Sequence, residues 1–282
     1  MLELARGFLE RKGLGEARLE AELLVAHALG LDRLRLYMEL DRPVSGPEVD
    51  AARDLLVRRG RREPTAYIVG RREFFGRDFL VGHGVLVPRP ETELLVDRSR
   101  EIASERGADA PPLRLLDVGT GSGCLAVTLA LELEGAEVHA VDASTEALRW
   151  ASQNAEVLGA TVHFHEGDGF AVAERLVQER GPFDIIVSNP PYVEERDRGL
   201  LAPEVVAHEP GVALFAPDGV PDHWALGFAE RVDRLVVPGG AILVELGYTQ
   251  APRLRATLGP DTRIHDDLAG VPRVLELSAK LG

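Results

Sequence analysis

The feature that most constrains the fold is a series of short apolar runs separated by longer stretches in the second half of the chain. The runs cover residues 113–118, 138–141, 161–164, 183–187 and 241–246. Strands buried on both faces have this pattern, and the stretches between them are long enough for helices. A last pair, 263–265 and 271–277, follows too closely for a helical crossover. The sequence therefore predicts an α/β fold with a doubly wound, mostly parallel seven-stranded sheet that ends in an antiparallel pair at one edge.

A glycine-rich loop follows the first of these strands. Residues 117–123 read Asp-Val-Gly-Thr-Gly-Ser-Gly, where the strand ends and a helix begins. Open α/β sheets bind ligands at this position, although a tight turn between strand and helix has a similar composition. The last glycine of the dinucleotide fingerprint is missing, and no Gly-Lys-Ser/Thr follows, so both phosphate-binding interpretations are weakened. The candidate ligand-binding residues are Gly119, Thr120, Gly121, Ser122 and Gly123.

Acidic residues follow the next two strands. Asp142 lies about twenty residues after the loop, where a carboxylate can accept both hydroxyls of a ribose. NAD and S-adenosylmethionine share that ribose, so Asp142 indicates a ribosyl cofactor without choosing between them. Asp168 follows the third strand and can accept an adenine amino group, with Phe170 covering the ring. An aspartate in such a place is also common in turns.

The fourth strand runs directly into Asn189-Pro190-Pro191-Tyr192. Two prolines remove two backbone donors and hold the chain extended, so the carbonyl groups around them have no ladder partner. The side-chain oxygen of Asn189 and the carbonyl oxygen of Pro190 can then accept both hydrogens of one NH2 group. That grip aims the nitrogen at a methyl carbon and stabilises the charge that develops on it. With Tyr192 as an aromatic wall, the tetrapeptide predicts methyl transfer to a planar amide or amine nitrogen; alone, it is equally compatible with a proline turn.

The part of the chain before the sheet has a different pattern. Residues 16–29 repeat apolar side chains at three and four positions, and Gly30 can end that helix. Ser45 and Glu48 form a candidate capping box for another helix. Residues 72–88 mix Phe and Val with Gly, as in a hairpin. The predicted domains are a helical bundle at 1–71, a β-hairpin linker at 72–90 and the sheet domain at 91–282.

Composition narrows the classes of partner. The formal net charge of −14 repels polyphosphate, so no nucleic acid partner is expected. No signal peptide and no apolar run of about eighteen residues is visible, which predicts a cytoplasmic protein without membrane contact. The single cysteine, Cys124, is expected to be a small buried helix residue. The basic stretch between Arg58 and Arg72 is expected to be a solvated face, with docking of an acidic partner as the alternative.

With these motifs, the chain resembles the class I methyltransferases and, among them, the protein-(glutamine-N5) methyltransferases of peptide chain release factors (the PrmC/HemK family). The resemblance covers nearly the whole chain. Besides the glycine loop and Asn-Pro-Pro-Tyr, it is carried by Pro-Thr-Ala-Tyr-Ile-Val-Gly at 64–70, Glu-Phe-Phe-Gly at 73–76, Val-Pro-Arg-Pro-Glu-Thr-Glu at 87–93, the helix at 17–30, Glu209-Pro210 and Ala213-Leu214. The segment from Arg89 to Glu93 is the most specific, whereas DNA adenine and some RNA methyltransferases share Asn-Pro-Pro-Tyr.

The resemblance implies a Rossmann-like fold, S-adenosylmethionine as methyl donor and S-adenosylhomocysteine as product. It implies that the substrate is the glutamine of a Gly-Gly-Gln loop in a class 1 release factor, contacted by the helical bundle, and that the enzyme is a monomer. Catalysis is assigned to Asn189, Pro190 and Tyr192, with Pro191 completing the substrate grip.

The same resemblance assigns the cofactor to a set of residues around the glycine loop. They are Gly119, Thr120, Gly121, Ser122, Gly123, Asp142, Asp168, Gly169, Phe170 and Asn189. Gly169 departs from the family, because relatives often carry a larger apolar residue there; adenine stacking is therefore expected to fall to Phe170. A longer stretch at 171–181 is expected to extend a surface helix.

Three alternatives are weighed against this function. An N6-adenine DNA or N2-guanine RNA methyltransferase would share the tetrapeptide but need a basic cleft, and usually a recognition domain, for its nucleic acid. An NAD-dependent oxidoreductase would need the missing glycine spacing and an acid–base residue beside the cofactor. A non-catalytic binding module would be expected to have a degenerate cofactor site, yet every expected position is filled.

Overall fold

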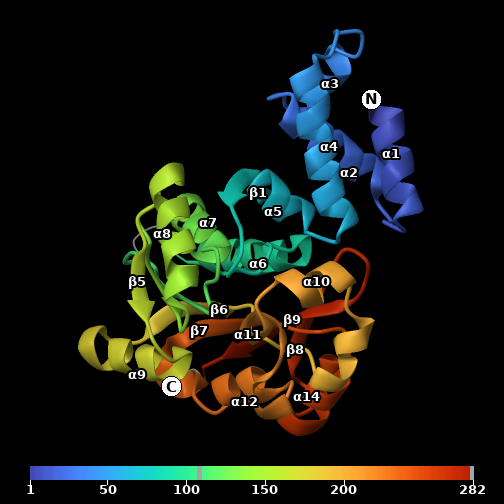
Figure 1. The fold of residues 1–282 in the computed structure, drawn as a ribbon. Coiled ribbons are helices and arrows are strands. Elements are labelled where there is room, and N and C mark those ends of the chain that lie inside the picture. Colours follow the sequence, from blue (N-terminus) through green and yellow to red (C-terminus); the bar gives the residue numbers. More distant parts are fainter. Residues whose placement is uncertain (107–109, 280–282) are drawn as a thin grey trace. The chain divides into compact units, whose positions relative to one another are not determined.

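The computed structural model describes residues 1–106 and 110–279, and its chain divides into two compact units (Figure 1). We call the first the helical unit; it comprises Met1–Arg71, Val81–His83 and Leu201–Glu209. The second, the sheet unit, comprises Arg72–Leu80, Gly84–Leu200 and Pro210–Gly282. The helical unit thus takes in two later segments that the predicted boundary at residue 71 leaves outside.

The helical unit is built from six helices around one apolar cluster. The helices are α1 (Leu2–Arg11), α2 (Ala17–Ala28), α3 (Arg33–Met38), α4 (Gly46–Gly60), α5 (Thr65–Val69) and α10 (Pro203–His208). Leu9, Leu24 and Leu36 are buried in the cluster because apolar side chains recur on one face of each helix. The predicted capping box is present at the start of α4, where the Glu48 carboxylate accepts the Ser45 backbone N–H at 2.8 Å.

The basic stretch at the end of α4 is not a solvated face throughout. Arg59 is only 4% exposed, and its guanidinium donates to Glu20 at 2.9 Å and to Glu204 at 2.7 Å. Arg58 pairs with Glu63. The prediction of a solvated face is therefore wrong for Arg59, which instead joins α10 to α2 and α4 by a buried ion pair within the helical unit.

The predicted hairpin is present but shorter than 72–88. It consists of β1 (Arg71–Phe74) and β2 (Arg77–Leu80), joined by Phe75 and Gly76, both with positive φ (50° and 72°). Two positive φ values in a two-residue loop match the right-handed twist of the strands. Beyond β2, the Val81 N–H still donates to the Gly70 carbonyl at 3.2 Å, and the Leu80 N–H and C=O bond to the side chain of Asn154, at 2.7 and 3.0 Å.

The sheet unit contains the predicted seven-stranded sheet, in the order β5-β4-β3-β6-β7-β9-β8 (Figure 1). The strands are β3 (Arg114–Val118), β4 (Glu137–Asp142), β5 (His163–Glu166), β6 (Phe183–Ser188), β7 (Val236–Glu245), β8 (Arg263–Asp266) and β9 (Pro272–Ser278). The first five pair in parallel, whereas β9 pairs antiparallel with both β7 and β8. The prediction of a mostly parallel sheet with an antiparallel edge is confirmed.

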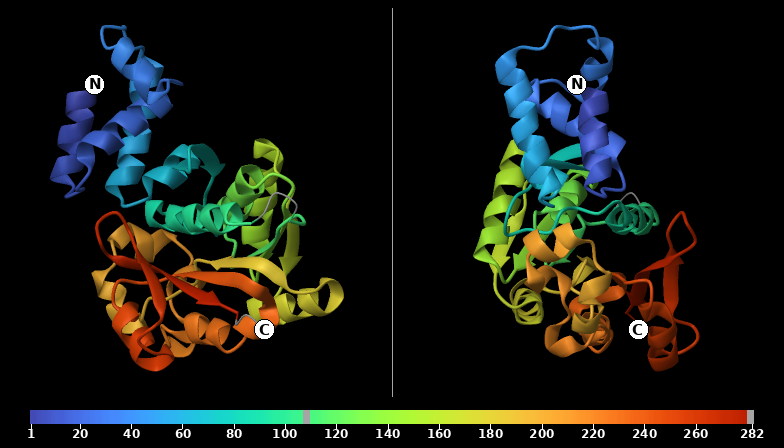
Figure 2. Two further views of the ribbon diagram at one scale, coloured as in Figure 1. Left: turned by 180° about the vertical axis from the view of Figure 1, so that it is seen from behind. Right: turned by 45° about the vertical axis from the view of Figure 1, so that its right-hand side comes forward.

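Helices cover both faces of this sheet (Figures 1 and 2). One apolar cluster joins the sheet to α6 (Glu93–Ser104), α7 (Cys124–Glu132) and α8 (Thr145–Leu158). The other cluster joins it to α9 (Gly169–Arg180), α12 (His223–Ala229), α13 (Val232–Leu235) and α14 (Gln250–Leu258). The expected surface helix at 171–181 is α9, and its Val172 and Leu176 are buried against the sheet.

Short elements complete the sheet unit. They are η1 (Pro90–Thr92), η2 (Glu195–Leu200), α11 (Gly211–Leu214) and η3 (Pro217–Gly219). Within the described ranges, none of the helices has both the length and the apolar composition needed to cross a membrane.

Candidate active site

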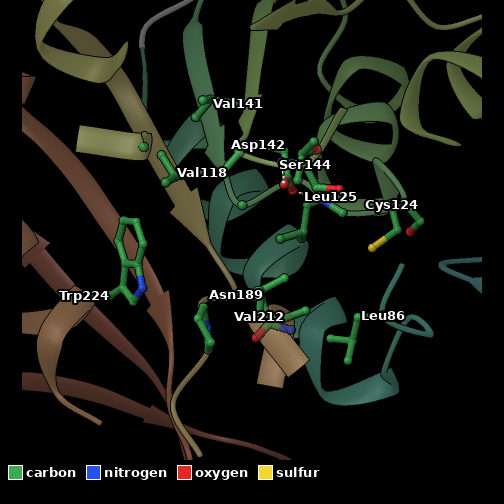
Figure 3. Close-up of a pocket in the computed structure, with 18 of the residues that line it drawn as sticks. Leu86, Val118, Cys124, Leu125, Val141, Asp142, Ser144, Asn189, Val212 and Trp224 are labelled. Atoms are coloured by element: carbon green, nitrogen blue, oxygen red, sulfur yellow. Dashed lines mark hydrogen bonds between the residues drawn. The ribbon is translucent and has the colours of Figure 1, made fainter. Parts of the chain in front are cut away.

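A cavity of about 420 Å³ opens at the carboxyl ends of four adjacent strands, β5, β4, β3 and β6. Its size lies within the usual range of roughly 300–1,000 Å³ for small-molecule sites. Figure 3 shows Asp142 towards one end of the cavity and Asn189 towards the other, with Trp224 along one side. The carboxyl edge of an open parallel sheet is where such folds bind ligands.

The glycine loop lines the cavity with backbone. Gly119 and Gly121 have positive φ values of 77° and 56°, and a Cβ on either would meet no atom within 4 Å. Both therefore face open space that a ligand can approach closely. Gly123 serves packing instead, because a Cβ there would lie 2.9 Å from the Cβ of Ala151 in α8. Thr120 and Ser122 also line the cavity, so it contains every loop residue of the predicted set except Gly123.

Asp142, at the end of β4, is held in place by backbone donors. Its Oδ2 accepts the Gly121 N–H and its Oδ1 accepts the Ser144 N–H, both at 2.9 Å. A carboxylate oxygen has capacity for a second hydrogen bond, so both oxygens can still accept a hydroxyl. Burial raises the pKa of this carboxyl, while the backbone donors oppose that shift. The arrangement suits a neighbouring pair of hydroxyls such as a ribose diol.

Asp168 is both a helix cap and a cavity residue. Its Oδ1 accepts the Ala171 N–H at 2.9 Å and caps α9, as expected for an aspartate before a helix. Gly169, the next residue, cannot be larger, because a Cβ there would lie 2.5 Å from Val118 Cγ1 and 3.2 Å from the Trp224 ring. Trp224 therefore fills the space beside Gly169.

Trp224, in α12, is a cavity residue that the sequence analysis missed. Phe170, the residue expected to cover an adenine ring, is not part of the cavity wall. The centroid of its ring lies 4.7 Å from the ring centroid of Trp224 and 5.0 Å from that of Phe228, and the Arg231 guanidinium lies over the Phe170 ring. The aromatic surface beside Gly169 thus belongs to Trp224, and Phe170 supports it from behind. No local pattern links these two distant positions in the sequence.

The transfer tetrapeptide follows β6 as predicted. Asn189 and Pro191 line the cavity, Pro190 is buried, and Tyr192 is half-buried with its ring against Gly247. The Asn189 Nδ2 donates to Thr92 Oγ1 at 2.9 Å. The Tyr192 hydroxyl donates to Glu245 Oε1 at 3.3 Å, and burial raises the pKa of this phenol.

Thr92 and Glu245 stand behind the tetrapeptide and were not predicted as site residues. Thr92 Oγ1 donates to Glu245 Oε2 at 2.5 Å, and each residue is 2% exposed. Thr92 ends η1, and Glu245 ends β7. Burial raises the pKa of Glu245 to about 7. The only sequence signal was that Thr92 falls within the family-like segment 89–93.

Cys124 begins α7, as predicted for a helix residue, but it is half-buried and lines the cavity. Burial and the nearby Asp117 raise the pKa of its thiol to about 12. The thiol therefore stays protonated at neutral pH, which is unsuitable for a nucleophile.

The strand order β5-β4-β3-β6-β7-β9-β8 with an antiparallel edge, the glycine loop after β3 and the aspartate at the end of β4 match the class I methyltransferases, which depend on S-adenosylmethionine. A solved structure of human methyltransferase 10 domain containing protein shares this fold, with a TM-score of 0.50 and 16% identity, covering 74% of this chain and 90% of that chain. Residues 1–70 match the family model of the PrmC N-terminal domain, and residues 96–212 match that of the methyltransferase small domain.

Relatives in several bacteria define the family more narrowly. The release factor glutamine methyltransferase of Chlorobaculum tepidum is 39% identical, covering 99% of this chain and 96% of the relative. That of Geobacter sulfurreducens is 43% identical, covering 89% and 84%. That of Bacillus subtilis is 37% identical, covering 90% and 89%. The chain belongs to the family of release factor glutamine methyltransferases, and the resemblance inferred from its motifs is confirmed.

Proposed function

We propose that this chain transfers a methyl group from S-adenosylmethionine to the side-chain amide nitrogen (N5) of the glutamine in the Gly-Gly-Gln motif of peptide chain release factors. The observation that carries the proposal is the position of the Asn189 amide. It lies at the opposite end of the cavity from Asp142, with its nitrogen bonded to Thr92. Its oxygen remains available to an incoming donor.

The cavity fits the cofactor on two structural grounds. The space over Gly119 and Gly121 would be filled by side chains at those positions, and Asp142 presents two anchored acceptors. When bound, S-adenosylmethionine supplies a methyl group on a positively charged sulfur. We assign the ribose hydroxyls to Asp142, the adenine amino group to Asp168 and the face of the base to Trp224. We place the remainder of S-adenosylmethionine along the backbone of residues 119–123.

The chain's own task at the other end is to orient a poor nucleophile. An amide nitrogen is weakly nucleophilic because its lone pair is delocalised. In our proposal, Asn189 Oδ1 and the Pro190 carbonyl oxygen accept its two N–H groups and stabilise the charge that develops on nitrogen. Pro191 and Tyr192 form the wall beside the flat amide group.

Release factors are the proposed partners, and we assign their recognition to residues 1–71, with 72–90 as linker and 91–282 as the methyltransferase domain. The charge of −14 supports a protein substrate over nucleic acid. We further propose a monomeric enzyme that acts in the cytoplasm, where translation takes place.

The direct test uses labelled S-adenosylmethionine with an intact release factor and with the same protein carrying alanine in place of the Gly-Gly-Gln glutamine. We expect label in the intact factor and none in the variant. Equal labelling of the two proteins, or labelling of DNA or RNA alone, would contradict the proposal and favour a nucleic acid methyltransferase.

A further inference from the structure

Two buried polar residues behind Asn189 have no role in the chemistry described so far. Thr92 comes from the turn before α6, and Glu245 from the end of β7. Both are 2% exposed, and their side chains meet at 2.5 Å. A buried carboxylate is costly unless it is well paired, and such groups cluster at functional sites.

The surroundings of Glu245 give it hydroxyl partners rather than a cation. Its two oxygens accept the Thr92 and Tyr192 hydroxyls, at 2.5 and 3.3 Å. Arg273 on β9 lowers the pKa of Glu245 and Glu91 on η1 raises it, but the Arg273 guanidinium pairs with Asp267 at 3.0 Å. In the described part of the chain, Glu245 forms no ion pair. Its charge is therefore directed onto the hydroxyl of Thr92, which bonds Asn189, and the hydroxyl of Tyr192, the last residue of Asn-Pro-Pro-Tyr.

The charge of Glu245 determines the direction of the whole hydrogen-bond chain. A carboxylate can only accept, so the single hydrogen of Thr92 Oγ1 points to Glu245. Thr92 then has only lone pairs left for Asn189, and the group facing it must be the NH2, as observed at 2.9 Å. An asparagine amide has nearly the same shape when its oxygen and nitrogen are exchanged, so the hydrogen-bond network sets its orientation.

We propose that Thr92 and Glu245 are positioning residues that hold the Asn189 amide with Oδ1 towards the substrate, and that Glu245 also orients Tyr192. The inference rests on the proposed function, because it explains how the site selects a group that donates two hydrogens. If the Asn189 amide turned round, its NH2 would face the substrate NH2, and donor would oppose donor. Among the described residues, the Asn189 side chain bonds through Nδ2 to Thr92, and no hydrogen bond reaches its Oδ1, which leaves this oxygen available for the substrate.

The first test removes the Thr92 hydroxyl without changing the shape of the side chain. In Thr92→Val, we expect kcat with a release factor to fall about 10- to 100-fold, somewhat less than the loss of a donor in direct contact with a transition state. The affinity for S-adenosylhomocysteine, measured by calorimetry, should stay within about 3-fold. Thr92→Ser keeps the hydroxyl and should restore kcat to within about 3-fold of the original chain.

Thr128 provides a matched control, because it is fully buried in α7 and its hydroxyl has no partner among the described residues. We call the hydrogen-bond chain from Glu245 through Thr92 to Asn189 the relay. Thr128→Val makes the same chemical change as Thr92→Val but outside the relay, so it should leave kcat unchanged. An unchanged kcat in Thr92→Val, or a loss in Thr92→Ser equal to that in Thr92→Val, would overturn the proposal.

The second test removes the charge of Glu245. The amide in Glu245→Gln has only one acceptor oxygen, so one hydroxyl must turn its hydrogen elsewhere; we expect kcat at pH 8 to fall about 10-fold. The pKa of about 7 adds a pH signature. In the original chain, the active carboxylate exists above this pKa, so kcat should decrease as the pH falls through about 7, and that decrease should be absent in Glu245→Gln. An unchanged kcat at pH 8, or an identical pH profile, would contradict the relay.

A readout without catalysis separates this inference from the proposed function. One Asn189 side-chain N–H is bonded to Thr92, so its exchange with solvent should be slow in NMR spectra and faster in Thr92→Val. The side-chain NH2 signal that is absent from the spectrum of Asn189→Asp is that of Asn189, which assigns the resonance. If release factors are not methylated but this protection depends on Thr92, the proposed function fails and the relay stands; if methylation occurs but the protection is identical in Thr92→Val, the relay fails alone.

Discussion

The two ends of the cavity, to which we assign cofactor binding and methyl transfer, are built in different ways. At the cofactor end, Asp142 is held by the backbone of Gly121 and Ser144, so one anchor is two residues away and the other belongs to the loop of the neighbouring strand. At the transfer end, Asn189 depends on the side chains of Thr92 and Glu245, which come from distant segments of the chain. Backbone donors are present whatever the side chain, so the cofactor end depends on few residue identities. The transfer end depends on each member of its relay.

The largest effect is expected at Asn189 itself. In the proposed mechanism, Asn189→Ala removes an acceptor in direct contact with the reacting group, so kcat should fall by about 100- to 1,000-fold. S-adenosylhomocysteine affinity should change little, because Asp142 and the glycine loop remain. Single-turnover transfer and calorimetry measure the two quantities separately. If Asn189→Ala instead lost mainly S-adenosylhomocysteine affinity, Asn189 would serve cofactor binding and the two ends would not have separate roles.

At the cofactor end, Asp142→Asn should raise the Kd for S-adenosylhomocysteine by about 10- to 100-fold. The amide must turn its NH2 towards either the Gly121 or the Ser144 N–H, and it loses the charge-assisted bonds to a ribose, each worth about 1.5–3 kcal/mol. At saturating cofactor, kcat should recover to near the original value. Failure of added cofactor to restore kcat would mean that Asp142 also serves the transfer step.

Substitution of Trp224 tests whether this cavity residue stacks on the base of the cofactor. Trp224→Ala should weaken S-adenosylhomocysteine binding by about 5- to 10-fold, the lower part of the range for stacking of a base on an aromatic ring. The chain has two tryptophans, so Trp150→Phe leaves Trp224 as the sole tryptophan, which can be excited selectively at about 295 nm or above. Its fluorescence should change on addition of S-adenosylhomocysteine. No change in that variant, with binding verified by calorimetry, would place the base elsewhere.

The smallest effect is expected at Cys124. Because the pKa of its thiol is raised to about 12, little thiolate exists at pH 8, and iodoacetamide should react more slowly with it than with glutathione. Cys124→Ser should keep kcat within about 2-fold, since the thiol takes no part in transfer. Faster alkylation than that of glutathione would show that the thiol is activated at the cavity wall.

The sequence predicted β3, β4, β6 and β7 well because each contains a compact apolar run. The run expected at 161–164 overlaps β5 only at residues 163–164, because β5 reads His-Phe-His-Glu. The loop at 119–123, Asp142 and Asn189 were located because each directly follows a predicted strand, and parallel strands bring their carboxyl ends to one edge. The hairpin was predicted too long because Val85 and Val87 continue its apolar pattern. In the structure no strand continues through these residues, and the outward-facing N–H and C=O of Leu80 bond to the side chain of Asn154, far along the chain.

Other features depended on residues that meet only after folding. Arg59 looked like part of a solvated basic run until Glu20 and Glu204 supplied its partners. Phe170 was the ring expected to cover an adenine, but the ring that lines the cavity is that of Trp224, which fills the space beside Gly169.

The sequence by itself therefore determined the class of fold, the family and the residues that follow each strand, because these depend on local patterns along the chain. Tertiary structure alone decided which aromatic ring lines the cavity and which groups stand behind Asn189. The physical reason is that a hydrogen bond or a packing contact depends on distance in space. Thr92 and Glu245 acquire their relation only when η1 and β7 lie beside the end of β6.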